Sequence, residues 1–490
     1  MDIPGPYDRR RFAVLLLSFY NVLLLCSTTP IYDGYPTTKF DPYQPEQIHI
    51  AYGEDYSMII TWSTFMRGLN TIVQYGTNSL DHIAYGKAQR FINPDLYFHT
   101  QYIHVATVPN LQPGVKYIYR CGAPEGWSKQ FNFTAKRNDS SWAPAIALFG
   151  DMGSANAQSL SRLIQDVQQN LYDAIFHVGD FAYDMHKGHG EVGDKFMRQI
   201  QPMAAVVPYM TCPGNHEAYA NFSNYKNRFH MPGDIDSNNM FFSFDIGPAH
   251  VISFSTEYYF FIEYGLYQIE HQYHWLEADL KKANEPANRA KHPWIITMAH
   301  RPMYCSNNDK DDCTKSESLI RKGIPIIHAY GLEDLFYKYG VDLEIWAHEH
   351  SYERLLPIYD RHVYNTSSIN PYYKPEAPVH ITTGSAGCSE KHDLFANKTA
   401  PWSAFRSVDY GYTRMKIHNS SHLYMEQVSD DKHGEVIDKM WLIKDKHGPY
   451  KDRTLKYNPK TEESLRRMEA INQKSIFANQ KKMPFRVIKK

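Results

Sequence analysis

The stretch that decides the fold is Gly179-Asp180-Phe181-Ala182-Tyr183, which follows the apolar run Ala174-Ile175-Phe176-His177-Val178. A continuous apolar run of this length, bounded by turn residues, is typical of a buried β-strand. Asp180 then lies where the strand ends, and α/β sheets bind their ligands at the carboxyl ends of strands. Tyr183 follows three residues later, close enough to share a site with Asp180 if the chain turns. The sequence therefore predicts a functional site at this strand end.

Four other strand-like runs also end in side chains that can bind a metal. The residues concerned are Asp151 after residues 145–149, Asn215 and His216 after 207–211, His300 after 294–299, and His348 and His350 after 341–346. Any one of them alone would be an ordinary turn or surface residue, but together they form a series of motifs in order. Carboxylate, phenol, amide and imidazole groups without a thiolate suit iron, zinc or manganese. We therefore predict a metal site.

The number of candidate ligands predicts a site for a pair of metal ions. The candidates are Asp151, Asp180, Tyr183, Asn215, His300, His348 and His350, and they fill eight ligand positions if Asp180 bridges the ions. Two cations about 3.5–4 Å apart can hold both the attacking and the leaving oxygen of a phosphoryl transfer. Alternation along an extended segment places His348 and His350 on the same side. His216, next to Asn215, remains free for proton transfer.

The chain changes character near residues 136–144, which are polar. Before this point, short strand-like runs are separated by turn residues without amphipathic helices, which favours a β-sandwich. The runs are 47–51, 58–64, 71–75, 102–108, 116–121 and 129–134. After it, strands alternate with helical patterns at 155–170 and 274–282, which is typical of an α/β domain. Further strands are expected at 251–255, 379–383, 412–427 and 436–443.

The first residues resemble a secretory signal peptide. Three arginines at 9–11 precede an apolar run at 12–25 and small residues at 26–28. Six Asn-x-Ser/Thr sequons favour a secreted glycoprotein: Asn132, Asn138, Asn221, Asn365, Asn397 and Asn419. We expect secretion to the extracellular space, with lysosomal delivery as the alternative, and no transmembrane segment after cleavage. Cys305 and Cys313 bracket a short polar stretch and are the predicted disulfide.

The formal net charge of −1 conceals a basic C-terminal segment. From Lys446 onward there are 13 Lys and Arg against 4 Asp and Glu, so the rest of the chain carries −10. A basic tail can contact anionic partners, but a solvated extension is the interpretation we adopt. No specific nucleic-acid partner is expected, and a homodimer stays open.

At this point the chain resembles a known family. Over roughly residues 40–445 it resembles the purple acid phosphatases, secreted dinuclear metallophosphatases of the calcineurin-like superfamily. Their motif series is Gly-Asp-x-Gly, Gly-Asp-x-x-Tyr, Gly-Asn-His-Glu, Val-x-x-His and Gly-His-x-His, and here Thr297 replaces the Val and Ala347 the Gly of the last two. Thr297 and Ala347 depart from the family pattern, and strand packing is expected to absorb both. Leu111-Gln112-Pro113 with Tyr117 resembles the tyrosine corner of fibronectin type III domains.

The resemblance implies the following domain order. We expect a signal peptide at 1–28, a fibronectin type III-like β-sandwich at 40–137, a dinuclear metallophosphoesterase domain at 143–400, closing strands of that domain at 401–445, and a basic tail at 446–490. The phosphoesterase domain should be an α/β fold with a β-sandwich core flanked by helices.

The resemblance also implies the role of each site residue. Iron(III) would be bound by Asp151, Asp180, Tyr183 and His350, and a second metal, iron, zinc or manganese, by Asp180, Asn215, His300 and His348. The expected reaction is hydrolysis of phosphate monoesters in acid by a metal-bound hydroxide, with His216 binding phosphate or protonating the leaving group. The loop after His300 lacks the histidines of plant members, which leaves Tyr304 as a predicted substrate contact.

Other functions remain open at this level. A phosphodiesterase or nucleotide-sugar hydrolase could use the same metal core, because pocket shape decides between monoesters and diesters. A non-catalytic secreted binding glycoprotein could use the β-sandwich and the basic tail. The complete set of candidate ligands argues against that last class, and the leading prediction is an acid phosphatase.

Overall fold

The computed structural model describes residues 41–450, except 96–98, 234–236 and 365–369. The predicted signal peptide, the sequon at Asn365 and the tail beyond Tyr450 therefore lie outside the described residues. None of the described helices has both the length and the apolar character that crossing a membrane requires.

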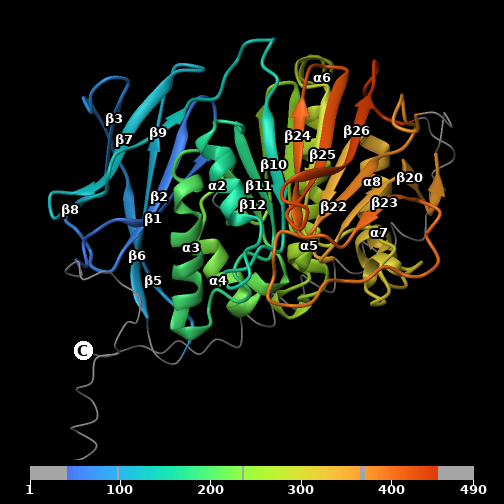
Figure 1. The fold of residues 1–490 in the computed structure, drawn as a ribbon, viewed down its shortest axis with the longest axis horizontal. Coiled ribbons are helices and arrows are strands. Elements are labelled where there is room, and N and C mark those ends of the chain that lie inside the picture. Colours follow the sequence, from blue (N-terminus) through green and yellow to red (C-terminus); the bar gives the residue numbers. More distant parts are fainter. Residues whose placement is uncertain (1–40, 96–98, 234–236, 365–369, 451–490) are drawn as a thin grey trace, which may run out of the picture. The chain divides into compact units, whose positions relative to one another are not determined.

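The N-terminal part of the described chain is a β-sandwich of two antiparallel sheets (Figure 1). The first sheet has the order β1-β2-β6-β5, which are Glu46–Tyr52, Met58–Thr64, Thr100–Val108 and Lys87–Ile92. The second has the order β4-β3-β7-β8, with β9 also on β7; these are His82–Tyr85, Ile72–Gly76, Lys116–Ala123, Gly126–Trp127 and Phe131–Thr134. Trp62 and Tyr119 are buried in its core. The tyrosine corner is present, since the backbone N–H of Gln112 donates to the hydroxyl of Tyr117 at 3.0 Å.

The rest of the described chain is built on two larger sheets. The six-stranded sheet has the order β12-β11-β10-β24-β25-β26, which are Tyr209–Cys212, Ala174–Val178, Ala145–Phe149, Gly411–Ile417, His422–Ser429 and Glu435–Ile443. The seven-stranded sheet has the order β13-β14-β15-β18-β22-β19-β23, which are Phe242–Ile246, Ala249–Ser253, Trp294–Met298, Leu343–Trp346, Val379–Thr383, Tyr352–Leu355 and Ser403–Ser407. The parallel strands are β12-β11-β10, at one side of the six-stranded sheet, and β14-β15-β18-β22, in the middle of the seven-stranded sheet. The strands of each run end at the same edge.

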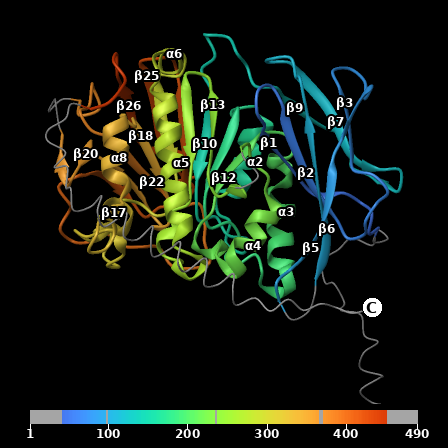
Figure 2. The ribbon, with the colours of Figure 1, turned by 180° about the vertical axis from the view of Figure 1, so that it is seen from behind.

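The two large sheets pack face to face. Side chains form hydrogen bonds across the interface. The hydroxyl of Ser253 donates to the backbone carbonyl of Thr211 at 2.9 Å, and the hydroxyl of Thr413 donates to the hydroxyl of Thr383 at 3.0 Å. The helices α2 and α3, Leu160–Gln168 and Glu191–Ala204, lie on one side (Figure 1). The helices α5 and α8, Tyr267–Ala283 and Leu332–Tyr339, lie on the other (Figure 2). The predicted fold class, a β-sandwich core flanked by helices, is confirmed.

The remaining named elements are short. They are α4 Tyr219–Arg228, α6 Pro286–Lys291, α7 Leu319–Lys322, β16 Gly323–Ile324, β17 Ala329–Tyr330, β20 Ile358–Tyr359 and β21 His362–Val363, with 3₁₀ turns η1 Gly188–Gly190, η2 Asn215–Glu217, η4 Glu257–Tyr259, η5 Ile262–Tyr264 and η6 Asp312–Thr314.

The structure differs from the predicted elements where tertiary contacts or unfavourable residues intervene. The helix expected at 155–170 begins only at Leu160, because the preceding turn bonds to another loop: the N–H of Ser159 donates to the carbonyl of Ala386 at 3.0 Å. The strand expected at 412–427 is divided into β24 and β25 by a turn around Asn419. Helix α3 was not expected, because it contains a glycine and Pro202.

Two further predictions concern the chain's covalent and terminal features. The disulfide between Cys305 and Cys313 is confirmed, with the Cα atoms 5.3 Å apart. The start of the predicted solvated tail is wrong, since the chain from Lys444 to Tyr450 packs on the core. The hydroxyl of Tyr450 donates to the carbonyl of Val341 at 3.0 Å. A solvated extension can therefore begin only after Tyr450.

Candidate metal centre

The seven predicted ligands come from the ends of five strands in both large sheets. Asp151 follows β10, Asp180 and Tyr183 follow β11, Asn215 follows β12, His300 follows β15, and His348 and His350 follow β18. These strands are parallel to their neighbours within each sheet, so their carboxyl ends share an edge. The structure thus gathers side chains that lie up to 199 positions apart along the printed sequence.

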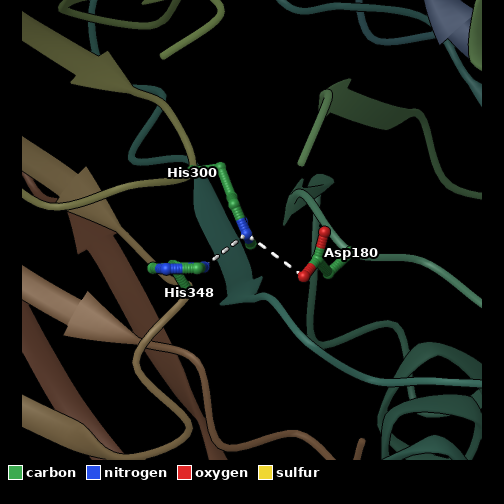
Figure 3. A group of neighbouring side chains, drawn as sticks. All are labelled: Asp180, His300 and His348. Carbon is green, nitrogen blue, oxygen red and sulfur yellow. Dashed lines mark hydrogen bonds and ion pairs between the residues drawn. The ribbon is translucent and has the colours of Figure 1, made fainter. Parts of the chain in front are cut away.

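Four of these side chains turn their donor atoms toward one point. The Nε2 atom of His300 lies 3.2 Å from Oδ2 of Asp180, 3.2 Å from Oδ1 of Asn215 and 3.2 Å from Nδ1 of His348. Figure 3 shows the His300 ring between the other two residues drawn, with Asp180 on one side and His348 on the other. Two oxygens and two nitrogens at this spacing match the ligand set predicted for the second metal.

The other three predicted ligands form a neighbouring group. The hydroxyl of Tyr183 lies 2.8 Å from Nε2 of His350 and 3.3 Å from Oδ1 of Asp151, and the latter two atoms are 3.6 Å apart. The other carboxylate oxygen of Asp151 accepts the backbone N–H of His348 at 2.9 Å, which ties the two groups together. The side chains of Asp151, Tyr183 and His350 are all buried. Bridging of the two groups by Asp180 stays a prediction.

Each of the three histidines binds an acceptor through the ring nitrogen that faces away from its group. The pairs are His300 Nδ1 with Val178 O at 2.9 Å, His350 Nδ1 with Lys391 O at 3.0 Å, and His348 Nε2 with Asp311 Oδ2 at 2.7 Å. Nε2 of His348 also lies 2.8 Å from the guanidinium of Arg301, which can only donate, so Asp311 alone does not set the tautomer of His348. The carbonyl oxygens behind His300 and His350 cannot donate, so the outer nitrogens of those two rings carry the proton. The inner nitrogen then keeps its lone pair, which is how proteins orient metal-binding histidines. The residues present therefore fit metal ions.

The backbone is strained at several of these positions. Asp151, Asp180, Tyr183 and His348 adopt φ angles of 57°, 51°, 56° and 69°, in the left-handed region that residues with a side chain usually avoid. Such conformations cost free energy and persist where the surrounding structure enforces them, most often at functional sites. The strain turns these side chains off their strands and toward the shared edge.

Two glycines make room for the buried side chains. A Cβ atom on Gly179, whose φ is 83°, would lie 2.4 Å from Nδ1 of His300. A Cβ on Gly150 would lie 2.4 Å from the Cβ of Ala347. The structure thus accommodates Ala347, one of the two departures from the family pattern, because its methyl group lies against a glycine.

Glu217 ties together the two turns that carry Asp180 and Asn215. Its carboxylate accepts the backbone N–H groups of Asp180 at 3.0 Å, Phe181 at 3.1 Å and Gly214 at 2.9 Å. This side chain is buried and does not line the pocket, so its contribution is to position the ligands.

The electrostatic field at the centre favours positive charge. Burial lowers the pKa of His300, but the carboxylates of Asp180 and Asp151 outweigh burial and raise this pKa to about 10. Burial would conversely raise the pKa of Asp180, yet His300 and His216 hold it well below its usual value. A field that holds protons on imidazole also attracts metal cations.

His216 lies at the wall of a pocket over this centre. Its Nδ1 is 3.0 Å from Oδ1 of Asp184. Burial lowers the pKa of His216, but the hydrogen bond to Asp184 and the charge of Asp180 outweigh burial and raise the pKa to about 9. The cavity has a volume of about 350 Å³ and is lined by Asp180, Asn215, His216, Asp309, Lys310, Asp311, His348, His350, Glu390 and Asp393.

The structure corrects one site prediction and adds residues that no motif indicated. Tyr304 is not a substrate contact, because its ring is 1% exposed and its hydroxyl donates to Glu333 away from the pocket. The loop closed by the disulfide instead presents Lys310 and Asp311 to the pocket. Asp184, next to the predicted ligand Tyr183, was also missed. Only their closeness in sequence to a motif could have drawn attention to them.

Comparison with family models divides the chain into three matched segments. A model described as "Purple acid Phosphatase, N-terminal domain" matches residues 45–135, and "Calcineurin-like phosphoesterase" matches residues 144–352. "Iron/zinc purple acid phosphatase-like protein C" matches residues 377–439.

Similar proteins span nearly the same length. The zebrafish (Danio rerio) protein "Acid phosphatase type 7" is 55% identical over 83% of this chain and 93% of its own length. The human protein of that name is 53% identical over 82% of this chain and 91% of its own. The solved purple acid phosphatase PPD1 of yellow lupin has a TM-score of 0.67 at 24% identity, covering 82% of this chain and 75% of that chain, and so shares the fold. The chain therefore belongs to the purple acid phosphatase family, and it is an acid phosphatase.

Proposed function

We propose that this acid phosphatase hydrolyses phosphate monoesters with a mixed iron(III)–divalent metal centre. The observation that carries the proposal is the orientation of His300 and His350. The outer nitrogen of each ring donates to a backbone carbonyl, and the inner nitrogen faces side-chain oxygens of other predicted ligands. Such an arrangement favours metal binding over a structural role.

The two groups of side chains differ in the metal they favour. Asp151, Asp180, Tyr183 and His350 would hold iron(III), since a phenolate favours a hard trivalent ion. Asp180, Asn215, His300 and His348 would hold iron(II), zinc or manganese, because a neutral amide and two imidazoles suit a divalent ion. When bound, the pair would neutralise the phosphate ester and supply a hydroxide nucleophile at acidic pH.

The chain's own residues would bind the substrate and move its proton. His216 lines the pocket and is held by Asp184 through Nδ1. Its Nε2 atom lies 3.6 Å from Glu390 and 3.8 Å from Asp180, and would turn to a phosphate oxygen or protonate the leaving alkoxide. Lys310 lines the same cavity and offers a second cation for phosphate. Asp184 is a positioning residue, because it contacts His216 and not the pocket.

The test compares leaving groups in wild type and in His216→Asn. General acid catalysis is worth about 10²–10⁴-fold in rate, so kcat for an alkyl phosphate should fall by that factor. The fall should be smaller for p-nitrophenyl phosphate, whose leaving group scarcely needs a proton. Iron and second-metal content, measured by plasma emission, should stay at the wild-type value.

Equal losses for alkyl and aryl substrates would remove His216 from the acid role, and loss of metal would make it a ligand. Monoester specificity is tested with wild type alone. Hydrolysis of bis-p-nitrophenyl phosphate at a kcat/KM equal to that of p-nitrophenyl phosphate would contradict it.

We also propose that the protein is secreted and glycosylated. Among the described sequons, Asn138, Asn397 and Asn419 are exposed, and Asn132 and Asn221 are half-buried, so none is enclosed in the core. Expressed in animal cells, the protein should appear in the medium without residues 1–28 and should shift in mass on enzymatic deglycosylation. Retention in the cell with an intact N-terminus would overturn this proposal.

A further inference from the structure

Glu349 lies between two predicted metal ligands and is not itself one of them. It is the middle residue of His348-Glu349-His350, and its side chain is fully buried at 0% exposure. One of its carboxylate oxygens lies within 4.8 Å of a ring nitrogen of His348 and of a carboxylate oxygen of Asp311. A fully buried carboxylate requires compensation by hydrogen bonds or by a cation.

Among the described residues, no cation and no N–H or O–H donor binds this carboxylate, and the nearby carboxyl group of Asp309 is close enough to share a proton with it. Its Oε2 atom has no hydrogen-bond partner. The atom nearest to Oε1 at hydrogen-bonding distance is Sγ of Cys313, at 3.1 Å, but this sulfur is in the disulfide and has no proton to donate. No Lys, Arg or His of the described chain forms an ion pair with this carboxylate. Its charged neighbours are instead other acids, Asp309, Asp393 and Asp311.

Two of these acids lie with Glu349 in one compact group. One carboxylate oxygen from each of Asp309, Glu349 and Asp393 lies within 4.8 Å of the others. Asp309 comes from the loop closed by the disulfide, Glu349 from the turn after β18, and Asp393 from the loop after β22. Nearby Asn307 donates to the carbonyl of Asp393 at 2.9 Å, and its own Oδ1 atom is buried without a partner.

We propose that Asp309, Glu349 and Asp393 bind a hard divalent cation, Ca²⁺ or Mg²⁺, in addition to the dinuclear centre. The group offers only oxygen atoms, which these cations prefer and which suit zinc or iron less well. Oxygens bound to Ca²⁺ at about 2.3–2.6 Å lie no more than about 5 Å apart, which is compatible with the observed spacing. Asp309 is exposed, so water can complete the coordination.

The cation would act on the dinuclear centre through the two loops it joins. Asp393 accepts the backbone N–H of His350 at 2.8 Å. Asp311, two residues after Asp309, accepts from Nε2 of His348 at 2.7 Å. Holding both loops against Glu349 would therefore keep both histidines oriented. Glu349 is a positioning residue in this scheme, because it does not line the pocket, whereas Asp309 lies both in this group and at the pocket wall.

The test measures cation binding directly in the holoenzyme. Wild type, purified with its iron and second metal in place, is dialysed against buffer free of Ca²⁺ and Mg²⁺ and titrated with either ion alone. Calorimetry should detect one additional ion per chain. At a hundredfold excess over the dissociation constant, the Tm should rise by about 3–5 °C.

Two variants and a control locate the site. Asp309→Asn, an exposed change that the fold tolerates, and Glu349→Gln should each lose the calorimetric signal and the Tm shift while keeping the dinuclear metals. Asp81→Asn, an exposed acid of the N-terminal sandwich, should behave as wild type. An unchanged Tm and no heat for wild type with either ion would overturn the proposal. Unaltered binding in both variants would do the same by placing the ion elsewhere.

Discussion

Asp342 and Glu349 flank strand β18, and both carboxyl groups are fully buried, but the chain surrounds them with different partners. Asp342 accepts from Lys444, from Arg289 at 3.2 Å and from the backbone N–H of Ile295 at 2.9 Å. Glu349 has three acids and a disulfide sulfur around it, and a ring nitrogen of His348 within 4.8 Å, but it forms no ion pair with a described Lys, Arg or His. Where the chain provides the cations, the carboxylate is structural. Where it provides none, a bound ion is the natural source of the missing charge.

Asp180 occupies an intermediate position between these two. It is buried like Asp342, but its partner His300, which also lies 3.2 Å from Asn215, is a group that can bind a metal. Its surroundings therefore suit a bound cation, whereas those of Asp342 are complete. Replacing each carboxylate in turn should therefore have effects that decrease with how much activity or stability rests on its negative charge.

The largest effect is expected for Asp180→Asn. A carboxylate shared by two metal ions cannot be replaced by an amide without loss of affinity, so turnover should fall by about 10³-fold or more. Metal content by plasma emission should fall with it. Asp81→Asn serves as the control and should keep both. Full metal content with normal turnover in Asp180→Asn would show that this residue does not bridge the ions.

The next largest effect is expected for stability at Asp342. Asp342→Asn leaves Lys444 and Arg289 without their shared partner, and breaking a buried pair costs about 3–5 kcal/mol of unfolding free energy. Removal of residues 444–490 should cost a similar amount, because it uncovers the same carboxylate. Removal of 451–490 alone should leave the urea unfolding midpoint unchanged. Equal midpoints for the two truncations would mean that the contacts of Lys444 and Tyr450 contribute nothing.

The Asp342 contribution has a defined pH dependence. Burial would raise the pKa of this carboxyl group, but Lys444, Arg289 and His447 outweigh burial and hold the pKa well below its usual value. A group with a lowered folded pKa stabilises the fold above its unfolded pKa of about 3.9 and loses that contribution as pH falls below it. The stability difference between wild type and Asp342→Asn should therefore be constant from pH 7 to 5 and shrink below about pH 4. If the stability difference already shrinks between pH 7 and 5, the stabilisation must come from another titrating group.

A moderate effect is expected for Asp311→Asn. Asn keeps an acceptor oxygen but not the negative charge, and loss of the carboxylate behind a metal-binding histidine typically costs about 10–100-fold in metal affinity. The second metal should therefore dissociate at a lower chelator concentration, while iron bound beside Tyr183 stays. Restored affinity in Asp311→Glu would support a positioning role. Equal release of both metals from Asp311→Asn would contradict the assignment of His348 to the second site.

The smallest effect is expected for Glu349→Gln in buffer without Ca²⁺ or Mg²⁺. Burial and the neighbouring Asp309 raise the pKa of Glu349 well above its usual value, so without a bound cation the amide replaces a carboxyl group that already favours its neutral form. The unfolding free energy should therefore stay within about 1 kcal/mol of wild type or increase. The same measurement on Asp342→Asn should show a large loss of unfolding free energy, so the two variants should differ in the sign or size of that change. A loss of several kcal/mol in Glu349→Gln would mean that the chain already compensates this charge.

The elements that sequence reasoning found are those governed by local pattern. Residues 145–149, 174–178 and 379–383 are strands with the predicted ends, because continuous apolar runs between turn residues leave little choice. The ligand candidates followed from the rule that sites lie at strand ends. Helix α3 was missed since local propensity argues against its Pro202.

The parts of the site that could not be predicted depend on loops. Asp311 and Asp393 reach the histidines only because a disulfide and the loop after β22 bring them there, and no spacing along the chain reports that contact. The isolation of Glu349 was also invisible, since a motif shows which residues are adjacent in sequence but not which partners are absent around a buried side chain. The prediction that Tyr304 contacts the substrate was wrong because its position in the loop after His300 does not show that the side chain is buried against Glu333.

The visible absorption of the purified protein tests the assignment of iron to Tyr183 most directly. We predict that wild type contains iron together with a second metal and absorbs in the visible, and that Tyr183→Phe loses this band at an iron content that remains measurable. A colourless, iron-free wild type with full phosphatase activity would contradict the account and assign the centre to two divalent ions.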